Sequence, residues 1–517
     1  MTAVGSMLCV VTLRACGHDG PVNRSNEAPT EWSNGATDFL QLDRADARPG
    51  DLAGWLAAAV REAVLDGRLP AGATLPASRT LAAELDVSRG TVTEAYRRLA
   101  ETGEVEGRGR AGTVVVGKAR PGLADAAAPA GAAPAAPPRR QGRTGRTSVF
   151  DELRAAHAEI DLVPGVPDLA GFPRAAWLRA ERRVLDELPA RALAYGDPRG
   201  EAALRAEVAT WLARYRGLRV DPAQVVVVAG VAQALALLAH VLRDAGHDAI
   251  AVEDPGSFGA RELLAWWGVA TPPVGVDERG IRVDDLRATG ADVVLTTPAH
   301  QFPLGVVLDG ARRRELLAWA ADGGLVIEDD YDAEHRYDRR PVAAVAAAAP
   351  GSVVYTGSLS KLVAPALRVG WLVVPPRWHE AVVEAKRQSD LGNPVVPQLV
   401  VASLLRSGAL ERHLRLARTR YRRRRDATAA AFARELPRAR VLGAAAGLHL
   451  TVTFDEVPAL DDVALARAAL ERGVAVHPLR WYRQRPGTPG VVLGYGAVGT
   501  GRLEEGVRRL AEAVDAR

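Results

Sequence analysis

The chain is poor in lysine, cysteine and methionine, and it has no long apolar run. Its two cysteines, Cys9 and Cys16, provide neither a disulfide framework nor the cysteine spacing of a zinc site, which is typical of the reducing cytoplasm. No apolar run approaches the roughly 20 residues of a bilayer-spanning helix, and no cationic flank precedes the short run Met7–Leu13. We therefore expect a cytoplasmic protein with no metal site and no membrane partner.

Size and charge leave several classes of protein open. At 517 residues the chain is too long for one ordinary hydrophobic core, so two or three domains are expected. A hydrophobic fraction of 48% is that of a globular protein. The net charge of +4 permits nucleic-acid binding without demanding it.

The scarcity of lysine makes Lys361 informative, because the other lysines are Lys118 and Lys386 alone. Apolar runs at 352–356 and 369–374 predict buried strands on either side of it, so that Lys361 lies on the turn between them. Arginine cannot form an imine at working pH because it stays protonated. Lys361 is thus a candidate Schiff-base nucleophile, and an ordinary surface lysine is the alternative.

Residues 38–117 predict three short helices followed by a hairpin. The first helix has an apolar stripe, the second begins near Ser78, and Ser88 is a suitable N-cap for the third. The apolar positions expected on the third helix are Val92, Ala95, Tyr96 and Leu99. A Gly/Arg-rich hairpin over 104–116 completes the pattern of a winged helix-turn-helix. A three-helix protein-interaction module is the alternative, because residues 79–118 are nearly neutral, with seven Arg or Lys against six Asp or Glu.

In a winged helix-turn-helix the third helix would enter the major groove of DNA by its N-terminal turn. The residues expected at base edges, at phosphates or, from the hairpin tip, in the minor groove are Arg79, Ser88, Arg89, Thr91, Thr93 and Arg110. Two segments outside this domain lack a folding pattern. Residues 1–37 are expected to be disordered, and residues 118–150 form an Ala/Pro/Arg-rich linker, a solvated tether whose cations would at most touch DNA non-specifically.

Residues 151–517 predict an α/β domain. Short, almost wholly apolar strands alternate with amphipathic helices such as 232–245 and 311–322. This alternation predicts a mostly parallel seven-stranded sheet that is covered on both faces. A long Arg-rich helical region follows. After it, strands near 449–454, 474–478 and 491–493 and a last helix, 501–516, predict a smaller C-terminal α/β subdomain.

Polar residues gather where the predicted strands end, which is the place where open α/β sheets bind ligands. The turn Gly230-Val231-Ala232 begins a helix whose backbone N–H groups can hold a phosphate. Asp329 ends a strand, and a buried acid there needs a cationic partner such as a protonated pyridine nitrogen. The remaining groups, suited to a phenolic oxygen or a phosphate, are His300, Ser358, Ser360 and Arg368. A phosphate, a pyridinium and an aldehyde together describe pyridoxal 5′-phosphate (PLP).

Two sets of motifs resemble known families. Leu69–Arg79 and Leu81–Val92 resemble the DNA-binding domain of GntR-type bacterial regulators. Five further motifs resemble those of the fold type I aminotransferases and occur in that family's order: Tyr195–Gly200, Glu253–Gly256, His300–Pro303, Glu328–Asp332 and Ser358–Lys361. The fusion of the two domains resembles the MocR-type regulators.

The resemblance implies a role for each matching residue. Lys361 would form the internal aldimine with PLP, Asp329 would pair with the pyridine nitrogen, and Tyr331 would hydrogen-bond the phenolic oxygen. Arg368, Ser358 and the 230–232 turn would hold the phosphate. Tyr195 would reach the cofactor phosphate of a dimer mate, with a simple turn aromatic as the alternative.

The chain also departs from the aminotransferase pattern. Where the family often has an aromatic residue that stacks on the cofactor ring, the chain has Ser257, followed by Phe258 as the candidate. Arg480 is the candidate for binding a ligand carboxylate, and a surface arginine is the alternative.

Three functions fit these motifs. The first is a homodimeric transcriptional regulator that binds operator DNA, associates with the nucleoid and senses PLP or an amine or amino-acid effector. In it, the resemblance implies, one chain's DNA-binding domain lies against the other chain's aminotransferase-like domain. The second is a working PLP-dependent aminotransferase with a DNA-binding appendage. The third is a DNA-binding protein whose aminotransferase-like part is only a dimerisation scaffold. We expect the first.

Overall fold

The computed structural model describes residues 51–65, 69–109, 112–116, 156–332, 334–337, 342–457 and 459–516. These residues divide into two compact units, a smaller one before residue 117 and a larger one from residue 156 onward. The expected disordered segment 1–37, the linker 118–150 and Arg110 lie outside the described residues. Within the described ranges, no helix combines the length and the apolar character that crossing a bilayer requires.

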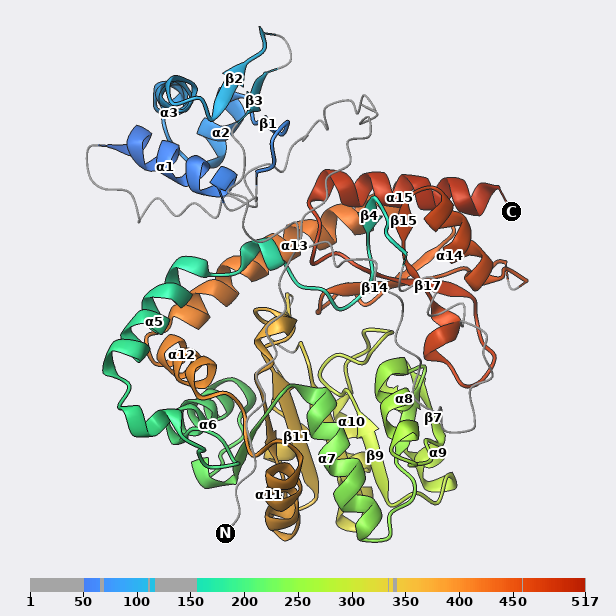
Figure 1. The fold of residues 1–517 in the computed structure, drawn as a ribbon. Coiled ribbons are helices and arrows are strands. Elements are labelled where there is room, and N and C mark those ends of the chain that lie inside the picture. The colour runs from blue at the N-terminus through green and yellow to red at the C-terminus, as the bar shows by residue number, and fades with distance from the viewer. Residues whose placement is uncertain are drawn as a thin grey trace, which may run out of the picture. The chain divides into compact units, whose positions relative to one another are not determined.

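The smaller unit is the predicted winged helix-turn-helix (Figure 1). Its helices are α1 (Leu52–Leu65), α2 (Ser78–Glu84) and α3 (Arg89–Glu101). Its antiparallel sheet has the order β1 (Thr74–Leu75), β3 (Thr113–Val115), β2 (Val105–Gly107). The four apolar residues predicted for α3 are all buried. The Tyr96 hydroxyl donates a hydrogen bond to the backbone oxygen of Pro76 at 2.9 Å, which ties α3 to the start of α2.

The larger unit is built on a mostly parallel sheet, as predicted. Its strands, in sheet order, are β5 (Val225–Val228), β12 (Gly370–Val373), β11 (Val353–Ser358), β10 (Leu325–Asp330), β9 (Val293–Thr296), β6 (Ala251–Asp254), β7 (Pro273–Asp277) and β8 (Gly280–Ile281). β12 runs antiparallel to both of its neighbours, and β8 runs antiparallel to β7. The two-residue β8 brings the sheet to eight strands instead of seven, because so short an edge strand leaves no periodic signal.

Helices cover both faces of this sheet, which explains why its strands are apolar throughout. One face packs against α7 (Val231–Asp244), α8 (Phe258–Trp266) and α11 (Pro376–Asp390). The other packs against α6 (Ala202–Arg216), α9 (Val283–Ala288), α10 (Gly310–Ala321) and α12 (Val395–Arg406). Along β5, Val226 and Val228 face the first layer, whereas Val225 and Val227 face the second.

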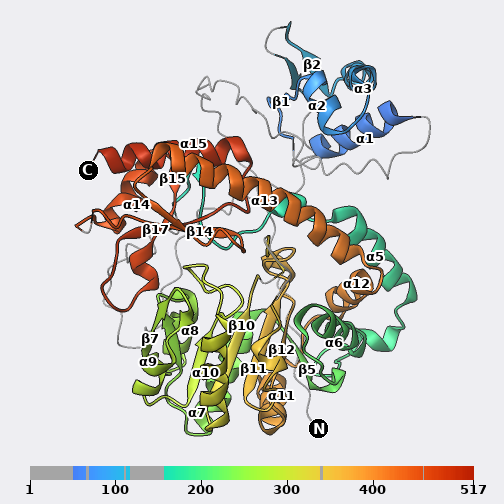
Figure 2. The same cartoon turned by 180° about the vertical axis from the view of Figure 1, so that it is seen from behind.

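The C-terminal part forms the predicted smaller subdomain (Figure 2). Its antiparallel sheet has the order β13 (Arg440–Leu442), β14 (His449–Thr453), β17 (Gly490–Gly494), β16 (His477–Pro478). The early strand β4 (Ile160–Asp161) pairs in parallel with β15 (Val474–Ala475), so the start of the larger unit is part of this subdomain. The helices α14 (Asp462–Glu471) and α15 (Thr500–Asp515) cover it.

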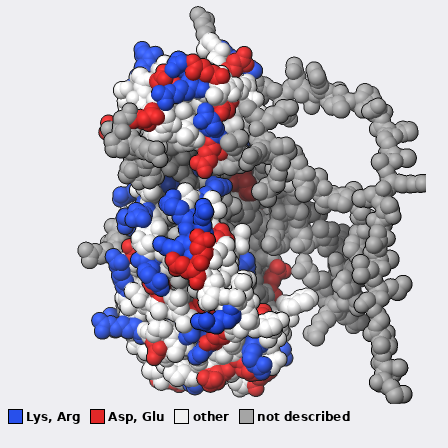
Figure 3. Space-filling view, turned by 60° about the vertical axis from the view of Figure 1, so that its left-hand side comes forward, with Lys and Arg blue, Asp and Glu red and all other residues white. Residues whose placement is uncertain are grey.

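The long helix α13 (Ala409–Glu435) joins the two halves of the larger unit. In both ribbon views it runs from the neighbourhood of α12 and α5 (Arg174–Glu187) to α15. Figure 3 views the larger unit from the side of α5, α12 and α13, where basic side chains form patches interrupted by carboxylates. The cavity described next lies between the large sheet and the smaller subdomain, because residues of both line it.

Candidate cofactor site

A cavity of about 340 Å³ lies at the carboxyl ends of the parallel strands of the large sheet. The predicted cofactor residues that line it are Val231, Ala232, Asp329, Tyr331, Ser358, Ser360, Lys361 and Arg368. They come from the ends of β10 and β11, the turn after β11 and the N-terminus of α7. The structure thus brings together most of the residues that the motifs indicate.

Lys361 lies in the turn between β11 and β12, as predicted. Its Nζ atom donates a hydrogen bond to the backbone oxygen of Gly165 at 2.6 Å. Burial lowers the pKa of Lys361, while the nearby carboxylates of Asp329 and Asp332 act in the opposite direction. A lowered pKa increases the fraction of neutral amine, which is the form that attacks an aldehyde.

Asp329 faces the cavity from β10. Burial, together with the charge of the neighbouring Asp330, raises the pKa of this carboxyl to about 7. The Thr356 hydroxyl, at 3.4 Å, is a weak partner for it. A cationic group placed in the cavity would stabilise the charged form of Asp329, and a protonated pyridine nitrogen is such a group.

The opposite end of the cavity is suited to a phosphate. Gly230 caps α7 with a φ of 85°, and a Cβ atom there would come within 3.3 Å of the Arg368 guanidinium. Glycine therefore lets Arg368 approach the N-terminus of this 14-residue helix, where backbone N–H groups favour an anion. The Ser358 hydroxyl, which accepts a hydrogen bond from the backbone N–H of Ser360 at 3.3 Å, adds a donor.

These three features fit pyridoxal phosphate. Lys361 would bind its aldehyde, Asp329 its ring nitrogen, and Arg368 with the α7 N-terminus its phosphate. When bound, the cofactor supplies an electron sink for reactions of amines. The residues of this chain would hold and orient it.

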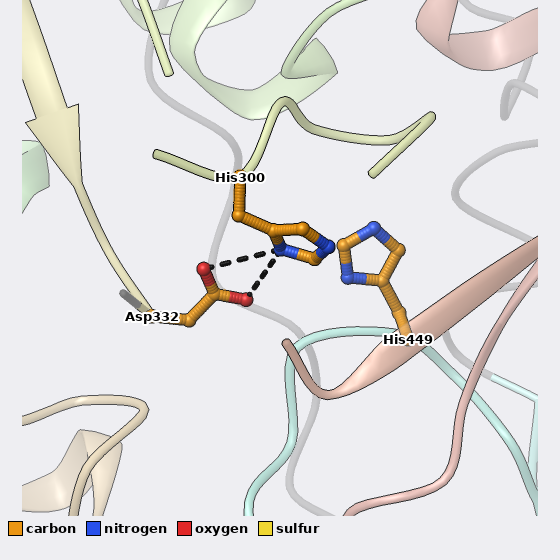
Figure 4. Close-up of side chains that lie close together, drawn as sticks. All are labelled: His300, Asp332 and His449. Carbon is orange, nitrogen blue, oxygen red and sulfur yellow. Dashed lines mark hydrogen bonds and ion pairs between the residues drawn. The ribbon is translucent and has the colours of Figure 1, made fainter. Parts of the chain in front are cut away.

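Tyr331 lines the cavity, and its hydroxyl contacts His300, which lies in a buried group of polar side chains with Asp332 and His449 (Figure 4). His300 does not line the cavity. Its Nδ1 atom lies 3.0 Å from the Tyr331 hydroxyl and 3.0 Å from Asp332 Oδ2. Burial raises the pKa of Tyr331, and Asp332 raises it further, so the phenol stays protonated and can donate a hydrogen bond. Burial lowers the pKa of His449 to about 3, which keeps this imidazole neutral.

Five predicted site residues lie outside the cavity lining: Gly230, His300, Phe258, Tyr195 and Arg480. The Phe258 ring packs against the small cluster of Leu479 and Tyr482, and Ser257 and Gly259 line the cavity instead. Tyr195 is 89% exposed and lies in a separate surface depression beside Leu391–Gln398. Arg480 is largely exposed and faces Asp461 and Asp462, with its Nε atom 3.6 Å from Asp462. This chain alone therefore gives Arg480 no access to the cavity.

Gly165 and His449 are among the cavity residues that the sequence reasoning missed. Gly165 contributes only a backbone oxygen, which any residue type could supply, so no sequence signal exists for it. His449 starts β14 and lines the cavity from the smaller subdomain. A histidine at the start of a buried strand was the available signal.

The predicted DNA-contact residues cluster around the start of α3. Arg79 and Arg89 are exposed, and Arg89 Nε donates to the Ser78 hydroxyl at 3.4 Å. The Ser88 hydroxyl accepts the backbone N–H of Thr91 at 3.1 Å, as an N-cap does, and lies 2.9 Å from the Thr91 hydroxyl. The Thr93 hydroxyl donates to the backbone oxygen of Arg89 at 2.9 Å. The two arginines therefore keep the most freedom to contact DNA.

Comparison with known families agrees with this division. Residues 52–115 match the model of bacterial regulatory proteins of the gntR family, and residues 160–490 match that of class I and II aminotransferases. Among solved structures, the multiple substrate aminotransferase from Thermococcus profundus has a TM-score of 0.66 and 28% sequence identity. The alignment covers 73% of this chain and 96% of that one. The aminotransferase-like domain is thus a PLP-binding domain, and the gntR domain binds DNA.

Full-length relatives share both domains. The chain is 32% identical over 464 residues to the probable rhizopine catabolism regulatory protein MocR of Rhizobium meliloti, covering 88% of this chain and 92% of that protein. It is also 32% identical over 459 residues to the pyridoxine biosynthesis transcriptional regulator PdxR of Corynebacterium glutamicum, covering 88% and 94%. The chain therefore belongs to the MocR-type subfamily of GntR-family transcriptional regulators, which join a winged helix-turn-helix to a PLP-binding aminotransferase-like domain.

Proposed function

We propose that this regulator changes its affinity for operator DNA when PLP, or a small amine that reacts with bound PLP, occupies the cavity around Lys361. The observation that carries the proposal is the presence of Lys361 and Asp329 in the same cavity. Both are ionisable, both face the cavity, and neither has an oppositely charged partner within hydrogen-bonding distance among the described residues. A ligand with an aldehyde and a cationic ring nitrogen satisfies both groups at once.

The effector is either the cofactor itself or an amine or amino acid. The relative from Corynebacterium glutamicum is named for regulating pyridoxine biosynthesis, which supports the cofactor as the signal. A ligand shifts a conformational equilibrium only by its differential affinity for the two states. Covalent capture at Lys361 supplies such a difference, because it is available only to a conformation in which the cavity is formed.

We further propose that the protein acts as a cytoplasmic homodimer that associates with the nucleoid through its operator. The exposed ring of Tyr195 supports the dimer, because a large aromatic side chain that is 89% exposed in one chain is suited to contact with a second. In such a dimer Tyr195 would reach the partner's cofactor phosphate. Arg79 and Arg89 would contact the operator.

The test combines visible absorbance with a DNA-binding titration, each with and without PLP. The native protein should be yellow and should bind its operator with an affinity that depends on PLP. Lys361→Ala should lose the absorbance of the lysine-bound cofactor and the PLP dependence together. Arg89→Ala should weaken DNA binding and leave the absorbance unchanged, which makes it the matched control. A native protein that remains colourless in excess PLP would contradict the proposal.

A working aminotransferase is the second candidate, and the retained Lys361 with its lowered pKa favours it. Steady consumption of an amino donor in the presence of a 2-oxo acid, at rates of about 1 per second or more, would support this function. A single turnover that stops after the bound cofactor has reacted would instead favour a sensor.

A further inference from the structure

The buried polar group beside Tyr331 contains three side chains of the metal-ligand type, His300, Asp332 and His449 (Figure 4). They come from the loop after β9, the segment after β10 and the start of β14. One potential ligand atom from each lies within 4.8 Å of the other two. None of them is needed to hold the aldehyde, the ring nitrogen or the phosphate of the cofactor.

Each histidine uses one ring nitrogen and leaves the other free. His300 Nδ1 lies 3.0 Å from Asp332 Oδ2, and His449 Nε2 lies 3.0 Å from the backbone oxygen of Pro303. Within the described residues, the buried Nε2 atom of His300 has no hydrogen-bond partner. Among the described residues, His449 Nδ1 has no hydrogen-bond partner either, and His449 lines the cavity. An imidazole held through one nitrogen by a carboxylate or a backbone carbonyl is the usual arrangement of a metal-binding histidine.

The backbone fixes the orientation of His300. A Cβ atom at Gly447, where φ is 80°, would overlap the His300 ring, and a Cβ atom at Gly305 would lie 3.1 Å from His300 Nε2. His300 is therefore packed directly against main chain on two sides. Its unpartnered nitrogen is held in place rather than averaged over rotamers. An orphaned buried nitrogen costs free energy, which a ligand for it would recover.

We propose that His300 and His449 bind one divalent transition-metal ion of the zinc class, with Asp332 orienting His300. Two imidazole nitrogens favour Zn²⁺, Co²⁺ or Ni²⁺ over Mg²⁺ and Ca²⁺, which prefer oxygen ligands. Zinc–nitrogen bonds of about 2.0–2.1 Å in a tetrahedron place the ligand atoms roughly 3.4 Å apart, which is closer than the 4.8 Å limit within which the potential ligand atoms of the cluster lie. His449 lines the cavity, so water or a small molecule bound there would complete the site. This inference is independent of the proposed response to PLP.

Cobalt is the appropriate probe, because tetrahedral Co²⁺ has a visible d–d absorption band. The full-length chain carrying Cys9→Ser and Cys16→Ser, which removes competing thiolates, is freed of cofactor and titrated with cobalt chloride. We expect a d–d band that saturates at one Co²⁺ per chain and disappears on addition of Zn²⁺. Equilibrium dialysis of the same protein against micromolar Zn²⁺ measures the stoichiometry independently.

Variants then locate the ion. His449→Gln should abolish the band, and Asp332→Asn should weaken cobalt binding by about 10- to 100-fold. His477→Gln, which replaces another buried histidine of the smaller subdomain, should leave both unchanged. Circular dichroism and melting identify any variant that fails to fold, and Asp332→Asn serves where His449→Gln does not. Absence of a band and of bound Zn²⁺ in the folded protein with native histidines would overturn the proposal, as would a band that survives both changes.

Discussion

Adjacent carboxylates on β10 differ in their partners: Asp330 forms a buried ion pair, whereas Asp329 faces the cavity. Asp330 accepts a hydrogen bond from Arg216 Nε at 2.6 Å and another from the Tyr355 hydroxyl, and both side chains of the ion pair are almost fully buried. Asp329, one residue earlier, faces the cavity, and its only side-chain hydrogen bond among the described residues is the weak contact with Thr356. Because successive residues of a strand point to opposite faces, the sheet separates a charge that stabilises the fold from one that is left for a ligand.

The two lysines of the described residues show the same contrast. The Lys386 ammonium is fully buried and pairs with Asp390 at 2.9 Å. Lys361 has only the backbone oxygen of Gly165. Burial lowers the pKa of both lysines, so burial alone does not distinguish them. An unpaired buried charge at a strand end therefore marks the cofactor site better than a shifted pKa does.

The buried ion pair of Asp330 and the cavity residue Asp329 also influence each other. Glu328, which faces away from the cavity like Asp330, accepts the backbone N–H groups of Val345 and Ala346 at 2.9 Å each. The negative charge of Asp330 contributes to the raised pKa of Asp329 through the strand. The charge of Asp330 therefore favours the binding of a cation by Asp329, on the opposite face of the sheet.

The largest expected effect on the free energy of unfolding comes from breaking the ion pair between Arg216 and Asp330. Arg216→Met would leave Asp330 buried without its cation, which costs about 3–5 kcal/mol of the free energy of unfolding. Denaturation in urea, followed through the transition of the larger unit, measures this loss. As a matched control, Arg287→Met removes an exposed pair with Asp322 and should change the same quantity by less than about 0.5 kcal/mol. Equal losses in the two variants would show that burial of the pair does not matter.

Sequence reasoning identified the charged residues of the cavity better than it identified the Arg216–Asp330 ion pair. Asp329 and Lys361 end or follow apolar strands, and parallel strands bring their carboxyl ends to one edge, so their meeting follows from the pattern. The partner of Asp330 has no such signal, because Arg216 lies 114 residues away on a helix. Pairing across that distance depends on how the helix packs, which the local pattern does not contain.

Local geometry explains the other differences. Ser257 caps α8, so the helix starts at Phe258 and turns this ring toward Leu479 and Tyr482 instead of the cavity. Arg480 lies on a 3₁₀ turn, Leu479–Tyr482, whose direction has no periodic signal. In both cases a rotation about the local backbone, not the position along the chain, decides what the side chain contacts.

An effect of intermediate size is expected on the pH dependence of the free energy of unfolding, through Asp329. Without cofactor, the pKa of Asp329 is raised to about 7 in the folded protein, against about 3.9 in an unfolded chain. The folded state then holds the proton more tightly, so the free energy of unfolding falls as pH rises from about 4 to about 7. Asp329→Asn cannot titrate. It should therefore gain stability relative to the native protein, on the order of 2 kcal/mol between pH 4 and pH 8.

Denaturation of the cofactor-free proteins at several pH values measures this difference. Glu328 and Glu334, whose pKa values burial also raises to about 7, are present in both proteins and cancel in the comparison. Saturating PLP supplies the control, since its ring nitrogen should stabilise the native protein at pH 8 more than the variant. If the free energy of unfolding depended on pH identically in the two cofactor-free proteins, the pKa of Asp329 would not be raised in the folded protein.

The smallest expected effect tests whether pairing alone makes a buried lysine structural. Lys386→Met leaves Asp390 without its ammonium, but the Asp390 side chain is 29% exposed and also accepts a hydrogen bond from Gln233 Nε2 at 2.6 Å. Water and Gln233 can therefore compensate in part, so we expect a loss of about 1–2 kcal/mol in the free energy of unfolding. Absorbance of the lysine-bound cofactor should be retained in Lys386→Met. If this band disappeared as it should in Lys361→Ala, the pairing of Lys386 with Asp390 would be part of the cofactor site, and the distinction between the two lysines would fail.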